Sequence, residues 1–401
     1  AAGEDIMSAD RGWLNVGRYA QERLVGGGIP ASPGTVLASV PGEPFNFDMD
    51  IAGPIAALSY DIAGEANTVC EVFFDITLVI FTPSSVYSQA SPKMSAEEAP
   101  EIRKSRAPGI DERLPALSLA DAIYYVQNGG RAIMALNYSE LGRNFLGDNA
   151  SVLSAFLVAK PIDWTTRRAT AGNDADLLVY INSDGRMVTV TLLRSQEVSG
   201  FMPHETDGKF VSLCTDGKQN MWFVVERETA EGPQLFFEQM EPDKLGDGGL
   251  EFSFGSPRTE ITGLAEFEGQ QRHVFSGGKW IGEFPVSAGK ITLPKPVTSA
   301  RVASWTAPRA TDTPFQPEEE NRAPLSRKKR VYGLDVSVMD TEALAVQVNG
   351  GAVYPHPMNA PFTGTIVLEG FPGFTADAML TVTQTRPGRL KVRMVKKRIA
   401  A

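Results

Sequence analysis

Short runs of alternating apolar and polar residues, separated by turns that contain glycine or proline, recur along most of this chain. One pattern returns 55 residues later: residues 125–131 read YVQNGGR and residues 180–186 read YINSDGR, and alternating apolar residues follow each copy. Because Asn-Gly and Asp-Gly supply the positive φ angles of tight hairpin turns, each copy predicts a strand, a turn and a returning strand. A supersecondary unit that recurs at about 40–55 residues is typical of a propeller blade or a related array.

The remaining pattern also favours strands over helices. Apolar runs of helical period are nearly absent, whereas residues 72–81, 210–226 and 235–240 predict further strands and hairpins. Turn signals at this spacing fit a propeller or stacked sheets. We therefore predict a mainly β protein, with β-propeller-like hairpin repeats followed by a second module that is a β-sandwich or barrel.

A chain of 401 residues is too long for one ordinary core, so we expect several domains. The composition along the chain predicts the following division: residues 1–50 form a loop-rich lead-in with one or two strands, 51–245 a β-propeller-like domain, 246–306 a second β module, 307–330 a polar, proline-rich excursion, and 331–401 a C-terminal β module with a basic end.

A charged stretch interrupts the predicted propeller-like domain. Residues 93–113 contain five basic and five acidic residues and are flanked by prolines. Such a balanced composition predicts a solvated loop with at most one helical turn, or a docking arm in an assembly.

The net charge and the residues able to bind metals exclude several classes of function. The formal net charge of −10 has the wrong sign for a protein that grips nucleic acid over its whole surface. Cys70 and Cys214 form no CxxC pair; we favour buried free thiols and leave a disulfide as the alternative. His204, His273 and His356 lie in separate segments without metal-ligand spacing, so we assign them structural roles and predict no metal and no cofactor.

The sequence offers no nucleophile motif for catalysis. It contains no G-x-S-x-G elbow, and no run approaches the ~18 apolar residues of a membrane helix. A propeller hydrolase would need paired carboxylates, for which Asp75, Asp121, Asp163 and Glu197 are candidates that the sequence does not pair. We predict that the protein is not an enzyme.

Basic residues gather at the C-terminal end. Residues 386–401 hold seven lysines and arginines and no acid, and in residues 390–395 these cations alternate with apolar side chains. A strand with this pattern buries one face and exposes positive charge on the other. It is either an edge strand protected by its charges or a contact for an acidic partner or phosphates. The candidate partner contacts are Arg327, Lys328, Lys329, Arg330, Lys396, Lys397 and Arg398.

Several short motifs resemble a known family when they are taken in order. They are LLRSQEVSGF at 192–201, TDGKF at 206–210, WFVVER at 222–227, ITGL at 261–264 and GKITLP at 289–294. Their order and spacing resemble the tail tubular protein B, or tail nozzle, family of short-tailed bacteriophages. Members of this family are usually longer, so we expect the part that corresponds to their N-terminal half to be another polypeptide, to be removed, or to be absent in a compact variant.

The resemblance implies a structural virion protein of the phage tail. Such proteins form a hexameric ring below the portal and adaptor and conduct DNA out of the capsid during ejection. The implied partners are further copies of the chain and other tail proteins, on the adaptor side or in the tail fibres, while the DNA passes without specific binding. The alternatives are another tail component, such as a receptor-binding or adhesion protein, and a propeller hydrolase.

Overall fold

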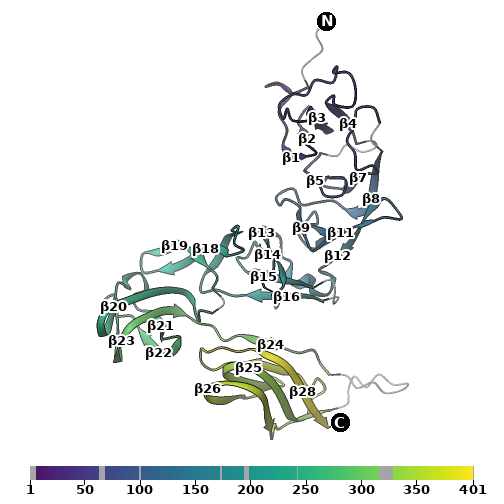
Figure 1. Cartoon of the computed structure of the whole chain (residues 1–401). Helices are drawn as coiled ribbons and strands as arrows, with labels where there is room; N and C mark the ends of the chain where they lie inside the picture. Colours follow the sequence, from purple (N-terminus) through teal and green to yellow (C-terminus); the bar gives the residue numbers. More distant parts are fainter. Residues whose placement is uncertain are drawn as a thin grey trace. The chain divides into compact units, whose positions relative to one another are not determined.

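The computed structural model describes residues 6–62, 68–98, 101–171, 174–193, 198–241, 243–315 and 328–400 (Figure 1). Two short 3₁₀ helices, η1 (Val152–Leu157) and η3 (Ala265–Phe267), stand among many strands in these residues. The chain forms two compact units: Ala1–Glu226 with Leu235–Met240, and Arg227–Gln234 with Glu241–Ala401. The prediction of a mainly β protein with propeller-like hairpin repeats and a second β module is confirmed.

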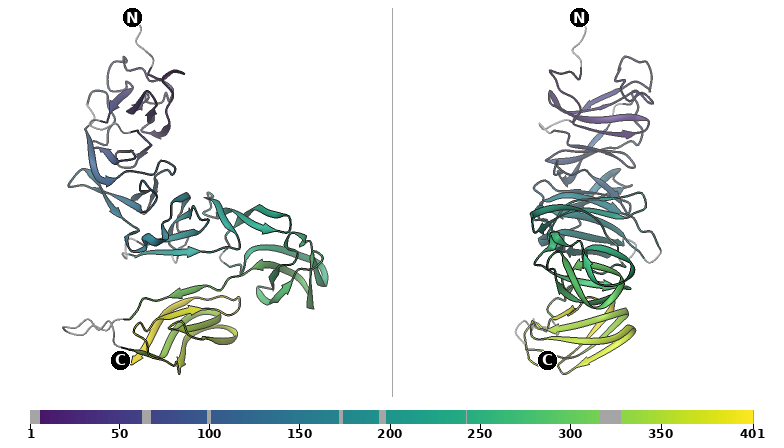
Figure 2. Two further views of the ribbon diagram at one scale, coloured as in Figure 1. Left: turned by 180° about the vertical axis from the view of Figure 1, so that it is seen from behind. Right: turned by 90° about the vertical axis from the view of Figure 1, so that its left-hand side faces the viewer.

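Five sheets follow one another from β1 to β19, and in each the strands pair in sequence order, as in propeller blades (Figures 1 and 2). The first sheet contains β1 (Val16–Ala20), β2 (Arg23–Ile29), β3 (Ser32–Ala38) and β4 (Leu58–Asp61). The second contains β5 (Glu71–Phe74), β6 (Leu78–Phe81), β7 (Ser85–Gln89) and β8 (Ile102–Pro108). The third contains β9 (Leu117–Leu119), β10 (Ala122–Val126), β11 (Ile133–Ser139) and β12 (Asn144–Asn149). The fourth contains β13 (Pro161–Arg167), β14 (Asp176–Asn182), β15 (Met187–Leu193) and β16 (Val198–His204), and the fifth β17 (Lys209–Thr215), β18 (Met221–Thr229) and β19 (Gly232–Gln239).

The repeated sequence motif forms equivalent hairpins in two successive sheets. The antiparallel pairs β10–β11 and β14–β15 hold the two copies. Tyr125 and Tyr180 are fully buried, and their hydroxyl groups donate to Pro108 O (2.7 Å) and Leu157 O (3.1 Å). Tyr125 therefore ties its hairpin to the end of β8 in the second sheet. Tyr180 ties its hairpin to η1, which precedes the fourth sheet.

The turns of the sheets are hydrogen bonded to the start of the next sheet. The first strands of successive sheets also contact one another, β1 with β5, β9 with β13 and β13 with β17. The backbone hydrogen bonds from turn to next sheet are Ile110 N to Thr82 O (3.0 Å), Lys160 N to Gly130 O (2.8 Å) and Phe210 N to Gly185 O (2.9 Å).

The apolar side chains of these sheets pack from each sheet to the next. One continuous core joins the second, third and fourth sheets and includes Phe81, Tyr125 and Tyr180. Separate clusters join the first sheet to the second and the fourth to the fifth. Each internal sheet is therefore covered on both faces, which explains the nearly continuous burial of strands such as β10.

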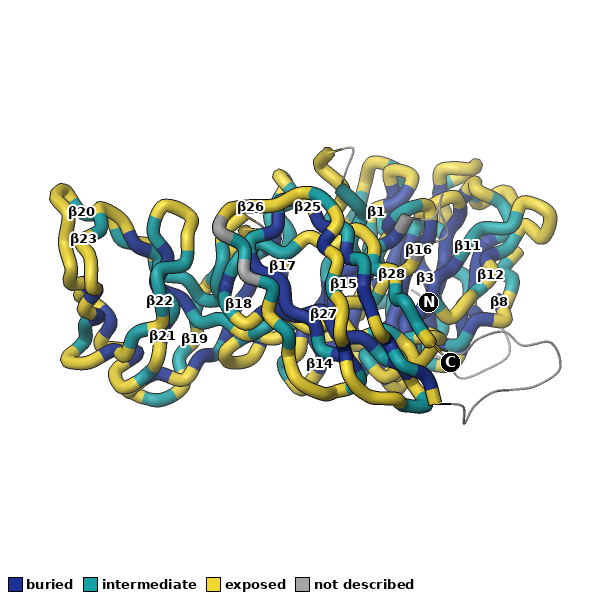
Figure 3. The backbone as a smooth tube through the Cα atoms, turned by 90° about the horizontal axis from the view of Figure 1, so that it is seen from below, coloured by how far each residue is buried: buried dark blue, intermediate teal, exposed yellow. Residues whose placement is uncertain are grey.

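Besides the end of the β18–β19 hairpin, the second unit contains a four-stranded sheet in the order β20-β23-β21-β22. Its strands are β20 (Asp247–Thr262), β21 (Gln271–Ser276), β22 (Lys279–Pro285) and β23 (Lys290–Ser304). The middle of the β20–β23 pair is a ribbon that is exposed over most of its length (Figure 3).

A last module is built around one long, bent strand. Its strands are β24 (Arg309–Thr311), β25 (Arg330–Val348), β26 (Val353–Glu369), β27 (Leu380–Thr383) and β28 (Val392–Ala400). β25 pairs with β26 along its length, with β28 in its first half and with β27 in its second half. The register shifts between Val338 and Ala343, where Asp340 has a φ of 45°, so β25 bends within its five-stranded sheet, whose strands share one apolar core.

Two expectations for the first unit are wrong. Residues 1–50 contain three strands instead of one or two. The triplet of glycines at 26–28 forms part of β2 and not a loop. Glycine suits this strand because a Cβ on Gly27 would stand 2.9 Å from Val69 Cγ1. Residues 93–113 include the strand β8, which buries Ser105 and Ala107 and exposes Lys104 and Arg106. The charge count concealed this alternation because the inward residues are small.

Candidate functional site

The basic C-terminal strand β28 lies at the edge of its sheet. In the described residues it pairs with β25 and with no other strand. Lys396 is exposed, whereas Lys397 Nζ lies 2.6 Å from Asp312 Oδ2 and Arg398 contacts Glu369 Oε1 at 2.7 Å. Two of the three predicted contacts in this strand are thus engaged within their own module.

The second basic cluster does not form one surface either. Arg327 lies outside the described residues, and Lys328 is exposed. Lys329 is completely buried and its Nζ donates to Phe315 O (2.8 Å), while Arg330 Nε donates to Phe371 O (3.0 Å). A long aliphatic stem allows a lysine to be buried while its amine reaches a carbonyl, so a run of cations in the sequence is not by itself a solvated face.

The carboxylates considered for hydrolysis are not brought together in the described structure. Asp75 and Asp121 are exposed in the turns β5–β6 and β9–β10, and Glu197 lies outside the described residues. Asp163 on β13 accepts hydrogen bonds from Ser212 Oγ (2.6 Å) and Leu213 N (2.9 Å). Its carboxylate therefore fastens the fourth sheet to the fifth.

The histidines are bound within the fold. His204 Nε2 lies 2.9 Å from Thr189 Oγ1, and His273 Nδ1 accepts a hydrogen bond from Trp280 Nε1 (3.1 Å). Burial lowers the pKa of both imidazoles. No group of three or more potential metal ligands occurs in the part of the chain that the structure describes.

Both cysteines are free, but only one is buried. Burial, with a smaller contribution from the charge of Glu112, raises the pKa of Cys70 to about 11. Cys214 is exposed, so the prediction that it is buried is wrong. It lies on β17, on the face opposite Leu213, which packs against the fourth sheet.

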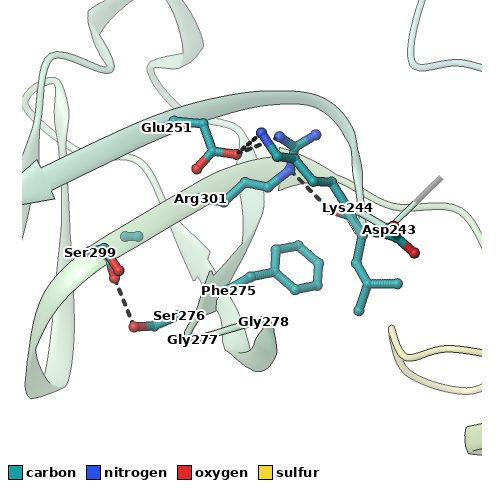
Figure 4. A pocket seen from close by; sticks show the side chains of 11 residues that line it. Asp243, Lys244, Glu251, Phe275, Ser276, Gly277, Gly278, Ser299 and Arg301 are labelled. Atoms are coloured by element: carbon teal, nitrogen blue, oxygen red, sulfur yellow. Dashed lines mark hydrogen bonds and ion pairs between the residues drawn. The ribbon is translucent and has the colours of Figure 1, made fainter. Parts of the chain in front are cut away.

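A cavity of about 260 Å³ lies in the first sheet of the second unit (Figure 4). Phe275, Gly277 and Ala300 contribute to its apolar lining. Its charged side chains neutralise one another: Glu251 contacts Arg301 Nη1 (2.9 Å) and Lys244 Nζ (3.3 Å), as Figure 4 shows. These mutual ion pairs leave little charge for recognising an ionic ligand.

The fifth sheet of the first unit exposes an apolar surface that the sequence reasoning missed. Leu235 and Phe237 on β19 are 64% and 69% exposed. The Phe237 ring stacks on Trp222 of β18, with centroids 5.0 Å apart and planes 5° from parallel. Alternation in residues 235–240 indicates that half of these side chains point away from the other half. The sequence alone does not tell whether another sheet covers them.

Comparisons with known proteins identify no family. No family model matches the chain, and no curated protein matches its sequence. Among solved structures, it resembles BBS1N in complex with ARL6DN (11% identity, TM-score 0.32, 55% of this chain and 60% of that chain). It also resembles an exo-β-1,3-galactanase from Phanerochaete chrysosporium (10% identity, TM-score 0.27, 94% of this chain and 94% of that chain). A protein from Lactobacillus plantarum is similar as well (12% identity, TM-score 0.35, 72% of this chain and 87% of that chain). The chain thus spans less than two thirds of the BBS1N chain, and similarities this weak carry no argument about function.

Among the described residues, no helix has the length and apolar character needed to cross a bilayer.

Proposed function

We propose that this protein is a structural component of a bacteriophage tail and that it assembles into a hexameric, nozzle-like ring through which DNA leaves the capsid. The observation that carries the proposal is the serial array of five sheets, in which hydrogen bonds and apolar cores fasten sheet to sheet. A heterologous assembly closes into a ring only when the two contacting surfaces of each copy are held at a constant angle. A firmly packed array meets that requirement better than domains joined by long loops.

The positions of the resembling motifs support the same proposal. Residues 206–210 lead into β17 and 222–227 lie on β18, while 261–264 end β20 and 289–294 begin β23. The motifs therefore lie on strands and turns of two consecutive sheets. Their order along the sequence is the order of these strands in the fold. The family motif at 194–197 lies outside the described residues.

The charge of the chain suits a conduit better than a DNA-binding protein. Contacts to several phosphates would create non-specific affinity and slow the passage of a duplex. A net charge of −10 per copy favours repulsion between the ring and the DNA. The basic strand β28 then belongs at contacts between proteins and away from the channel.

The native mass of the purified chain, with negative-stain images, tests the proposal. We expect a ring of six copies with an open axis and no retention of duplex DNA at physiological salt. A trimer without a channel would favour an adhesive tail component. A chain that stays monomeric at every concentration would contradict the ring, and an activity screen with Asp75, Asp121 and Asp163 replaced singly would then test the hydrolase alternative.

A further inference from the structure

The fifth sheet of the first unit has one strand fewer than the sheets before it. Each of the first four sheets contains four strands, whereas β17, β18 and β19 form a three-stranded sheet in the described residues. Since β13 contacts β17, the first strands of the fourth and fifth sheets are neighbours. In the part of the chain that the structure describes, no strand beside β19 takes the position that β16 has in the fourth sheet, next to the third strand.

Between Pro233 and Glu238 the edge formed by β19 lacks the features that discourage pairing. Cations, prolines and short length protect exposed strand edges. The edge strand β8 exposes Lys104 and Arg106, and β4 is only four residues long. Between Pro233 and Glu238, by contrast, β19 carries no charge and exposes Leu235 and Phe237. The Trp222–Phe237 stack extends this apolar surface onto β18.

A second edge, at the other end of the chain, is complementary to the first. β28 pairs on one side with β25, and Val392 (38% exposed) and Met394 (60% exposed) alternate with the exposed Arg393. The β18–β19 hairpin exposes Glu228 and Glu231 beside its turn, so negative charge lies at one end of the β19 edge, whereas β28 is basic.

We propose that β28 of one copy adds to β19 of a second copy as the fourth strand of its fifth sheet. Like charges that face each other across a strand pair are destabilising, so two β28 edges repel one another, whereas β28 and the acidic hairpin attract. Strand addition satisfies backbone groups along both edges and buries the apolar side chains beside them. The two contacting surfaces differ, so the interface is heterologous and propagates from copy to copy. The inference deepens the proposed ring and rests on it for the presence of several copies.

Cross-linking between two differently labelled chains tests this pairing. In a Cys214→Ser background, in which only the buried Cys70 remains, one chain carries Phe237→Cys and the other Met394→Cys. We expect a mixed dimer on treatment with a short bis-maleimide, and no comparable product from either chain alone. The matched control is Met202→Cys on β16, an edge residue with the same 60% exposure as Met394, which should give only the collisional background.

Charge exchange supplies the second measurement. Replacing Arg393 and Lys396 by glutamate should raise the concentration at which half of the chains associate several-fold, because the longer-range attraction between β28 and the acidic end of the β18–β19 hairpin becomes a repulsion. Replacing Glu228 and Glu231 by lysine in the same chain should restore it. All four side chains are exposed, so circular dichroism should show unchanged folding.

The outcomes separate this inference from the proposed function. Three cross-linking results would overturn the strand addition. The first is a mixed dimer no more abundant than with Met202→Cys. The others are a cross-link between Phe237→Cys of two copies and a cross-link within one chain. An unchanged concentration of half-association in the charge-reversed variant would do the same and leave the conduit intact. A mixed cross-link from a chain that forms no closed ring would contradict the conduit and support the pairing.

Discussion

Two adjacent glycines in the β10–β11 turn separate backbone strain from the contact between sheets. Gly129 and Gly130 both have positive φ angles, 94° and 68°. A Cβ on Gly129 would meet nothing within 4 Å, whereas a Cβ on Gly130 would lie 2.8 Å from Lys160 Cα in the next sheet. Alanine at either position is strained, but only at Gly130 must the neighbouring backbone also move.

The difference between the two substitutions can be estimated from these contacts. A left-handed backbone conformation costs a residue with a Cβ about 1–2 kcal/mol, which is the whole effect that we expect for Gly129→Ala. For Gly130→Ala, overpacking adds about 1–3 kcal/mol, and weakening the 2.8 Å bond from Lys160 N to Gly130 O adds about 1 kcal/mol. We expect a total loss in the free energy of unfolding of about 3–6 kcal/mol.

Native-state hydrogen exchange of the amides in β10, β11 and β13 is the appropriate assay, because it measures local stability in a chain with several modules. Protection should fall much further in Gly130→Ala than in Gly129→Ala, and the loss should extend to β13. Gly185→Ala should resemble Gly130→Ala, since its Cβ would lie 2.7 Å from Lys209 Cβ. Equal losses in Gly129→Ala and Gly130→Ala would refute the idea that this turn fastens one sheet to the next.

Three further predictions concern single side chains. In the native protein at pH 8, a thiol reagent should label Cys214 rapidly and Cys70 only after unfolding, because Cys70 is buried and its pKa is raised to about 11; rapid labelling of both would contradict the assignment. Hydrogen bonds, chiefly from the Asn220 side chain, lower the pKa of Asp216 to about 2. The ionised carboxylate therefore stabilises the fold above the unfolded pKa of about 3.9, and this contribution is lost as the pH falls towards 2. Between pH 5 and pH 2.5, the Asp216→Asn variant should lose less resistance to urea than the wild type. Lys397→Glu should lower the unfolding midpoint because it removes the contact with Asp312, whereas Lys396→Glu should leave the midpoint unchanged and affect assembly only; equal midpoints for the two variants would contradict this distinction.

The features that local sequence determines were predictable. The Asn-Gly and Asp-Gly turns and the alternation around them specify the two repeated hairpins, because turn geometry and side-chain direction depend on a few neighbouring residues. The repeat at 55 residues and the absence of helical periodicity together indicate the mainly β fold.

Features that depend on distant partners were not predictable in the same way. Nothing near Lys329 in the sequence indicates that its amine binds Phe315 O, and nothing near Cys214 indicates that its face of β17 is uncovered. The exposure of Leu235 and Phe237 depends on whether another sheet packs on their face of β19, which is a property of the whole array. Charge counts were equally insufficient for β8, where the pairing partner decides which residues point inward.

The hydrogen bonds from each turn to the following sheet impose a direction on folding. Each of the five sheets from β1 to β19 is assembled from consecutive strands, so its own pairing requires only local loops to close. Gly130 O and Gly185 O, however, gain their partners only when the first residues of the next sheet arrive. We therefore expect structure to propagate from the N-terminus as the chain is synthesised, with each completed sheet serving as the template on which its successor nucleates.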